Sequence, residues 1–189
     1  MALSDFEYMN QALCLALRGR GRTSPNPIVG AIVVSDGVVV GSGYHQEAGS
    51  PHAEVHALSA AGSAAKGATL FCTLEPCCHT GRTGPCVEQI VEFGIRRVVV
   101  TVEDPNPLVA GGGISFLRDQ GVQVEVGLCG REAFQVNRDF FTFIRYNRPF
   151  VTMKIALSID GYTTSKEGSR ATITSTTANR HAHLLRAEV

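Results

Sequence analysis

The chain has 189 residues, of which 44% are hydrophobic, and its 17 basic and 17 acidic side chains give a formal net charge of zero. This length suits one domain, or one domain with a fragment of another. The neutral charge disfavours a nucleic-acid partner, because phosphate contacts dominate such binding and require a basic surface. It does not exclude a small substrate that carries a single phosphate.

The N-terminus lacks the pattern of a secretory signal, because Asp5 and Glu7 stand where its apolar segment would begin. No apolar run approaches the ~20 residues of a membrane span. We therefore expect a cytoplasmic protein without membrane contact, whose six cysteines are reduced. Clustered, reduced cysteines are typical of metal ligands or catalytic groups.

The first predicted elements are a helix and a hairpin. Ser4 and Glu7 form a capping-box pattern, and helically spaced apolar residues follow to about position 17. Two β-branched runs, 28–34 and 38–43, flank an Asp-Gly pair and predict a β-hairpin.

Helices and strands alternate in the remainder of the first 147 residues. We expect helices at 51–62, 85–94, 113–120 and 129–147, and strands at 68–74, 96–102 and 122–126. This alternation predicts an α/β sandwich with a largely parallel sheet behind the hairpin. A helix that ends before Pro149 separates a domain at 1–147 from a remainder at 148–189.

Three candidate metal ligands each follow a proline directly. His52 follows Pro51, Cys77 follows Pro76 and Cys86 follows Pro85, so all three are expected at helix starts. A helix N-terminus lowers the pKa of a thiol below its free value of ~8.5, which favours the thiolate that zinc requires. One histidine and two cysteines leave an open position on a tetrahedral zinc ion, as in catalytic sites.

Glu54 is predicted to be a proton carrier rather than a fourth ligand. It lies two residues after His52, too close for both to chelate from one helical turn. The arrangement follows the H-x-E…P-C-x-x-C pattern of zinc nucleobase deaminases, in which the glutamate is a general acid and base. The gap between Cys77 and Cys86 departs from this pattern, because residues 78–85 separate them in place of the usual two.

With this wide gap, the segment TLEPCCHTGRTGPC resembles the deaminase domain of the bifunctional riboflavin-biosynthesis deaminase/reductase family. The segments TSPNPIVGAIVV, GSGYHQEAGSPHAE and VEDPNPLVAGGG are similar to the same family, and the resemblance covers residues 1 to about 147. It implies a cytidine-deaminase-like three-layer α/β/α sandwich. It also implies hydrolytic deamination of 2,5-diamino-6-ribosylamino-4(3H)-pyrimidinone 5-phosphate, in which oxygen replaces the ring's 2-amino group and ammonia leaves.

The resemblance also implies roles for individual residues. His52, Cys77 and Cys86 would bind one zinc ion, and Glu54 would carry protons from the attacking water to the ring and the leaving amine. Substrate contacts are implied for six residues, Asn26, His45, His79, Arg82, Asp104 and Asn106. The Asn26 amide suits the edge of a heterocycle, and His79 and Arg82 suit a phosphate. We also expect a homo-oligomer, either a dimer or a tetramer.

The segments 148–165 and 173–189 resemble the opening of the family's reductase domain, which has a dihydrofolate-reductase-like fold and uses NADPH. The positions that match are Lys154, Ser158, Asp160, Arg180 and Arg186. About 40 residues cannot build an independent core. We therefore expect an incomplete reductase segment from a longer bifunctional enzyme, which neither binds NADPH productively nor catalyses reduction.

Two other functions are compatible with the same motifs. A nucleoside or RNA/DNA base deaminase of the same superfamily would have to flip its target base and grip the flanking backbone, which the neutral charge disfavours. A structural zinc module would need a fourth protein ligand, with Cys78 and His79 as candidates, and would leave Glu54 unexplained.

Overall fold

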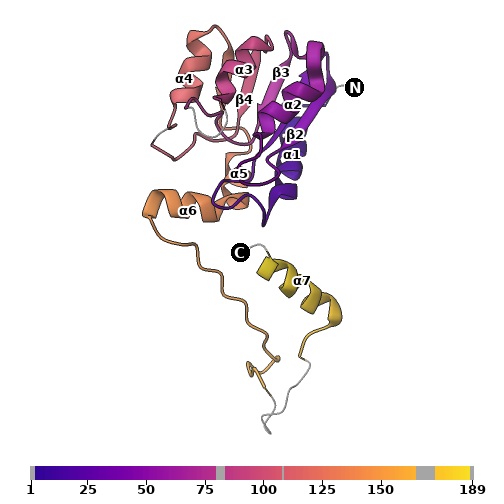
Figure 1. Cartoon of the computed structure of the whole chain (residues 1–189). Helices are drawn as coiled ribbons and strands as arrows, with labels where there is room; N and C mark the ends of the chain where they lie inside the picture. Colours follow the sequence, from indigo (N-terminus) through magenta and orange to yellow (C-terminus); the bar gives the residue numbers. More distant parts are fainter. Residues whose placement is uncertain (1–2, 80–83, 108, 165–172, 188–189) are drawn as a thin grey trace. The chain divides into compact units, whose positions relative to one another are not determined.

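A computed structural model describes residues 3–79, 84–107, 109–164 and 173–187 (Figure 1). The chain divides into two units, Met1–Phe150 and Val151–Val189. Each unit is described below by itself.

The first unit is built on a mixed sheet of five strands in the order β2-β1-β3-β4-β5. The strands are β1 (Gly30–Ser35), β2 (Val38–Tyr44), β3 (Thr69–Cys72), β4 (Arg97–Val100) and β5 (Gln123–Val126). Strand β1 is antiparallel to both β2 and β3, whereas β3, β4 and β5 are parallel. The predicted hairpin is confirmed, and Asp36 and Gly37 both have positive φ angles, 49° and 77°, which suit a two-residue turn.

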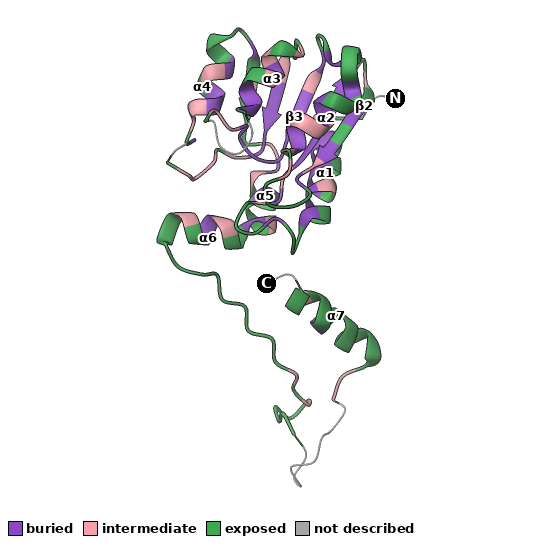
Figure 2. Cartoon of the chain, in the orientation of Figure 1, coloured by how far each residue is buried: buried purple, intermediate pink, exposed green. Residues whose placement is uncertain are grey.

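Helices cover both faces of this sheet (Figures 1 and 2). Helices α1 (Asp5–Ala16) and α5 (Gly130–Val136) pack on one face, and α2 (Ala53–Ala61), α3 (Cys86–Glu92) and α4 (Gly112–Asp119) pack on the other. The unit also contains α6 (Arg138–Tyr146) and the short 3₁₀ helices η1 (Leu17–Gly19) and η2 (Gly62–Ala65). The capping box predicted for α1 is present, with Ser4 and Glu7 bonded reciprocally.

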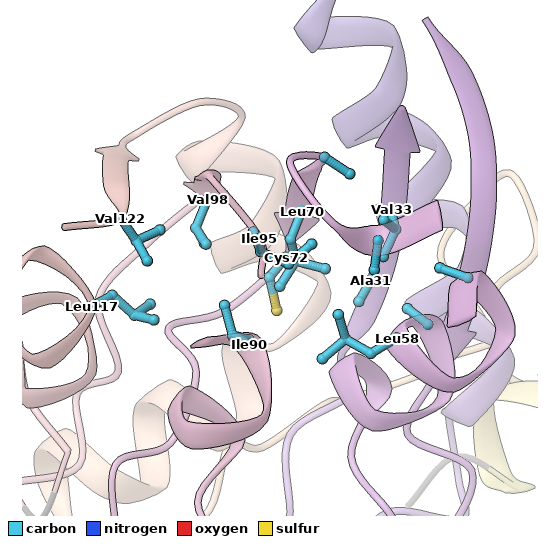
Figure 3. Packing of buried hydrophobic residues seen from close by; sticks show 14 of the residues in the cluster. Ala31, Val33, Leu58, Leu70, Cys72, Ile90, Ile95, Val98, Leu117 and Val122 are labelled. Carbon is cyan, nitrogen blue, oxygen red and sulfur yellow. The ribbon is translucent and has the colours of Figure 1, made fainter. Parts of the chain in front are cut away.

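Alternate residues of the central strands pack into two separate cores. Leu70 and Val98 point to the side of α2, α3 and α4, where Figure 3 shows them packed with Leu58, Ile90 and Leu117. Their neighbours Phe71 and Val99 pack instead with α1 and α5. This period of two is the geometry of a strand buried on both faces. The predicted three-layer α/β/α sandwich is therefore confirmed.

Close contact between α2 and β2 depends on Gly43. A Cβ atom at this position would lie 2.6 Å from the carbonyl oxygen of Ala53 and 2.5 Å from the Cβ of His56. Because real side chains cannot approach so closely, glycine allows the first turn of α2 to lie against the sheet. This contact sets where the residues at the start of α2 are held.

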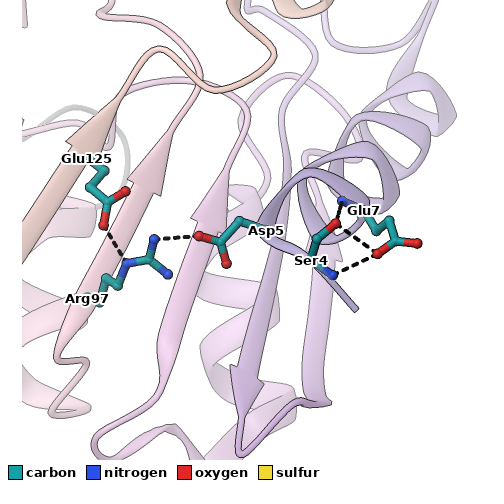
Figure 4. Close-up of polar contacts among 5 residues, drawn as sticks. All are labelled: Ser4, Asp5, Glu7, Arg97 and Glu125. Carbon is teal, nitrogen blue, oxygen red and sulfur yellow. Dashed lines mark hydrogen bonds and ion pairs between the residues drawn. The ribbon is translucent and has the colours of Figure 1, made fainter. Parts of the chain in front are cut away.

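The ion pairs in Figure 4 tie α1 to the parallel strands. Arg97 at the start of β4 bonds to Asp5 of α1 and to Glu125 of β5. Hydrogen bonds to these two carboxylates, Asp5 first, raise the pKa of the Arg97 guanidinium. Both pairs are made by Arg97 at the start of β4, so they link α1, β4 and β5 near the end of the sheet where the parallel strands begin.

The prediction of one continuous helix over 129–147 is wrong. The structure has two helices, α5 and α6, which meet at Asn137. Asn137 has φ −116° and ψ 23°, outside the helical region, and it is buried. Its side chain bonds to the backbone of Ile28 at both ends, with Ile28 N–H donating to Oδ1 and Nδ2 donating to the Ile28 carbonyl, each at 2.8 Å. This tertiary contact interrupts the helix.

In the second unit, the described residues form one helix, α7 (Thr176–Ala187). Residues 151–157 form no strand, and Val151 and Met153 are 76% and 79% exposed. A strand needs a neighbouring strand to bond its backbone, and the described residues of this unit form none. A turn at Ser158–Tyr162 follows. None of the described helices in the chain has both the length and the apolar character needed to cross a membrane.

Candidate active site

The start of α2 holds the first two candidate residues. His52 is the N-cap of α2, with extended backbone, and Pro51 precedes it. Glu54 follows in the first turn and is only 3% exposed. The predicted placement of His52 at a helix start is therefore confirmed.

The two cysteines come from different kinds of local structure. Cys86 is the first residue of α3, as predicted. Cys77 lies in irregular backbone after β3, so the prediction of a helix start there is wrong. Pro76 continues the loop that leaves the sheet rather than opening a helix. Hydrogen bonds from Cys86 and then His52 lower the pKa of the Cys77 thiol well below its usual range, and one of the Cys86 bonds comes from the backbone N–H at the start of α3, 3.4 Å from Cys77 Sγ.

The three candidate ligand atoms lie near the spacing that zinc requires. The Nδ1 atom of His52 is 3.1 Å from the Sγ atom of Cys86 and 3.4 Å from that of Cys77. Tetrahedral zinc, with Zn–N of ~2.0 Å and Zn–S of ~2.3 Å, separates its nitrogen and sulfur ligands by about 3.6 Å. Within the described residues, neither Cys78 nor His79 joins this group. Three protein ligands fit a zinc site with an open fourth position.

Glu54 lies in a dry environment beside these ligands. Its burial raises its pKa to about 6, and His52 opposes this shift. A bound cation would favour the carboxylate and lower the value again. A buried carboxylate beside the metal ligands can accept a proton and return it, which is what general acid–base catalysis needs.

A cavity of about 180 Å³ opens at the ends of β3 and β4, where loops leave the parallel strands. Ligand sites of α/β folds lie at this edge of the sheet. The lining includes His52, Glu54 and Cys77, together with five predicted substrate contacts, namely Asn26, His45, His79, Asp104 and Asn106. Arg82 lies outside the described residues. The cavity thus gathers segments that are distant in the sequence.

His45 is buried and both of its ring nitrogens have partners. Nδ1 lies 3.2 Å from the carbonyl oxygen of Pro51, and Nε2 lies 3.2 Å from the amide nitrogen of Asn26. A carbonyl can only accept, so Nδ1 carries the proton and Nε2 accepts from Asn26. Burial also lowers the pKa of His45 and favours this neutral form. The contact orients the Asn26 amide, whose Oδ1 stays available as an acceptor.

Asp104 and Asn106 form a small turn on the wall of the cavity. The backbone N–H of Asn106 donates to Asp104 Oδ1 at 2.8 Å. Burial and, to a smaller extent, the nearby Glu75 carboxylate raise the pKa of Asp104 to about 6, although the hydrogen bond from Asn106 opposes this shift. The turn therefore presents a partly desolvated carboxyl group to a ligand.

Sequence reasoning missed two buried residues that shape the cavity. Glu75 lines it and accepts hydrogen bonds from the backbone of the segment that follows β4. Asn137 holds Ile28, whose neighbours Pro27 and Val29 line the cavity. The sequence signals were weak, namely an acidic residue directly after an apolar strand and an asparagine inside a helical pattern.

The reductase-like candidates belong to the second unit. Lys154, Asp160, Arg180 and Arg186 are exposed. Ser158 is half-buried and its Oγ donates to Asp160 Oδ1 at 2.5 Å.

Comparisons with known proteins agree with the fold and the ligand set. Residues 3–102 match the cytidine and deoxycytidylate deaminase zinc-binding region, and residues 149–189 match the RibD C-terminal domain. The chain therefore belongs to the cytidine and deoxycytidylate deaminase family, a class of zinc-dependent hydrolytic deaminases. Zinc is the cofactor of this class, and His52, Cys77 and Cys86 form the candidate site.

More specific similarity is to riboflavin biosynthesis proteins named RibD. The chain is 53% identical to that of Aquifex aeolicus (97% of this chain, 52% of the relative) and 50% identical to that of Escherichia coli (98% and 51%). It spans about half the length of these relatives. A RibD structure from Acinetobacter baumannii superimposes with a TM-score of 0.91 at 45% identity, covering 97% of this chain and 51% of that one.

Replacing either cysteine ligand should remove zinc. We expect Cys77→Ser and Cys86→Ser to reduce bound metal well below one zinc ion per chain, because a hydroxyl is a poor zinc ligand beside a thiolate. Elemental analysis of purified protein measures this. Cys78→Ser is the matched control and should retain zinc, and a comparable loss in that variant would instead indicate a four-ligand structural site.

Asn137→Asp should destabilise the first unit. The new carboxylate keeps an acceptor for the Ile28 N–H, but it places a second acceptor against the Ile28 carbonyl oxygen. We expect a loss of about 1–3 kcal/mol in the free energy of unfolding, measured by denaturant titration. Asn147→Asp changes an exposed asparagine and should leave stability nearly unchanged. Equal stability of the two variants would show that the Ile28 contact contributes little.

Proposed function

We propose that the chain catalyses the hydrolytic deamination of 2,5-diamino-6-ribosylamino-4(3H)-pyrimidinone 5-phosphate in riboflavin biosynthesis. The observation that carries the proposal is the cavity, because Glu54 and the candidate zinc ligands His52 and Cys77 line it together with the predicted substrate contacts Asn26, His79, Asp104 and Asn106. A structure from Thermotoga maritima, 39% identical with a TM-score of 0.91 over 96% of this chain and 52% of that one, is titled a diaminohydroxyphosphoribosylaminopyrimidine deaminase/5-amino-6-(5-phosphoribosylamino)uracil reductase.

Glu54 is the proton carrier in this proposal. A bound zinc ion would acidify water and so supply the nucleophile at neutral pH. The Glu54 carboxylate accepts the two protons of the attacking water in turn and delivers one to the ring nitrogen and one to the amine, which leaves as ammonia while the ring carbon keeps the oxygen. The burial of Glu54 supports this role, because bulk water is excluded from the proton's path.

The polar residues around the cavity would recognise the substrate. Asn26, oriented by His45, offers Oδ1 to an N–H group at the edge of the pyrimidine. His79, with Arg82 from the adjoining segment, would bind the phosphate, and Asp104 and Asn106 would contact the remaining polar edge. The cavity is small and the chain is neutral overall, which suits a small substrate better than a nucleic acid.

We propose the same division of the chain as the sequence suggests. Residues 1–147 form the deaminase domain, and residues 148–189 begin a reductase domain that would use NADPH when complete. The match of residues 149–189 to the RibD C-terminal domain supports this division. We further propose that the enzyme is cytoplasmic, in keeping with six cysteines that form no disulfide. We also propose that it is a homo-oligomer.

Glu54→Gln should abolish ammonia release from this substrate while zinc stays bound. The amide preserves the shape of the side chain but cannot carry the proton, so we expect a loss of at least about a hundredfold in kcat. Ammonia release and bound zinc are measured on the same preparation. Glu47→Gln, a nearby exposed change, should keep full activity.

Two results would contradict the proposal. Ammonia release from cytidine or RNA but not from the phosphorylated pyrimidine would favour a nucleoside or RNA deaminase. An active, zinc-loaded Glu54→Gln variant would show that Glu54 is not the proton carrier.

The 189-residue polypeptide should not oxidise NADPH in the presence of the deaminated product. Among the described residues of the second unit, Ala182 is the one hydrophobic residue that is buried. These described residues therefore form no hydrophobic core that could hold a nucleotide. Absorbance at the NADPH band provides the measurement, with the Thermotoga maritima relative as the positive control. Steady NADPH oxidation by the polypeptide would show that this unit is competent by itself.

A further inference from the structure

Glu75 accepts four hydrogen bonds from the backbone of one segment. Its Oε2 accepts from the N–H groups of Asp104 at 3.0 Å and Gly111 at 2.9 Å. Its Oε1 accepts from Gly113 at 2.9 Å and Ile114 at 3.1 Å. The side chain is only 4% exposed, so these bonds replace the water that the carboxylate has lost.

This set of bonds determines what Glu75 can do. A carboxylate offers about four lone-pair positions, and four backbone donors occupy them. Although Glu75 lines the cavity, it has no acceptor left for a metal or a substrate. Its function must therefore be exerted through the segment that it holds.

That segment carries two of the cavity's polar residues. It begins at Asp104, whose Oδ1 accepts from Asn106, and it ends in the first turn of α4. Glu75 stands two residues before Cys77, so its carboxylate connects the loop of a zinc ligand to the Asp104–Asn106 turn. The N-terminus of α4 also favours a negative charge, which adds to the four bonds.

The close approach of the two segments is independently visible at Gly113. A Cβ atom there would lie 2.0 Å from the carbonyl oxygen of Pro76 and 3.2 Å from Glu75 Oε1. Any larger residue would force the start of α4 away from the Glu75–Cys77 loop. Gly113 and the Glu75 carboxylate therefore both allow the start of α4 to lie against the Glu75–Cys77 loop.

We infer that Glu75 is a positioning residue that holds Asp104 and Asn106 at the cavity wall, where they bind the substrate. This inference rests on the proposed deaminase function for its kinetic consequence. It assigns Glu75 no contact with the reacting atoms. Loss of its bonds should therefore weaken substrate binding more than the chemical step.

The first test is Glu75→Gln. The amide keeps one oxygen, but its NH₂ group faces two N–H donors, so one pair of backbone bonds is lost. We expect KM to rise about tenfold or more and kcat to change less than about threefold, with zinc content unchanged. Glu103→Gln is the matched control, because Glu103 is an exposed carboxylate directly before the same segment. Amide hydrogen exchange at 104–114 should become faster in Glu75→Gln and stay unchanged in the control.

A double-mutant cycle with Asn106→Ala separates positioning from general destabilisation. If Glu75 acts through the Asp104–Asn106 turn, Glu75→Gln should add little to the KM of Asn106→Ala. Gly113→Ala, which separates the same segments by another route, should raise KM in the same way and serves as the test if Glu75→Gln does not fold. An unchanged KM in an active, folded variant, or fully additive effects in the cycle, would overturn the inference. Absence of ammonia release from the wild type would instead overturn the proposed function, and the exchange measurement would still test the positioning.

Discussion

The burial of negatively charged groups at one edge of the sheet is the constraint on which the rest of the structure depends. Glu54 and Cys86 are buried and Cys77 is nearly so, and their ionised forms would repel one another in a dry environment. The starts of α2 and α3 provide partial positive charge at this point. A zinc ion held by His52 and the two thiolates would supply the remainder. Metal binding and the stability of this edge are therefore coupled.

The walls of the cavity obey a second constraint, which is that buried polar groups need partners. His45 bonds to Asn26 and Pro51, Asn137 to Ile28, and Glu75 to four backbone groups. In each case one buried side chain fixes a loop that has no regular structure of its own. Rigid loops of this kind can present polar atoms to a small substrate with little loss of entropy on binding.

The two units of the chain differ in how well they satisfy their own backbone and apolar groups. The first encloses two cores on either side of five bonded strands. In the second, the apolar residues Val151, Met153 and Ile155 stay exposed and their backbone forms no sheet. A strand from this segment would need neighbouring strands, and the described residues of the second unit form none.

Local sequence determined the hairpin, the capped first helix and the alternation of helices and strands. It also determined the candidate zinc ligands His52, Cys77 and Cys86. Each of these features depends on residue type and on spacing along the chain. Tertiary contacts decided the rest. Asn137 broke a helix that its neighbours favoured, since pairing with Ile28 is worth more than one more helical turn. Cys77 begins no helix of its own and took its environment from Cys86 and His52. The role of Glu75 depends on backbone groups at least 29 residues further along the chain, which only the tertiary structure brings to its carboxylate. The sequence around Glu75 gives no information about these partners.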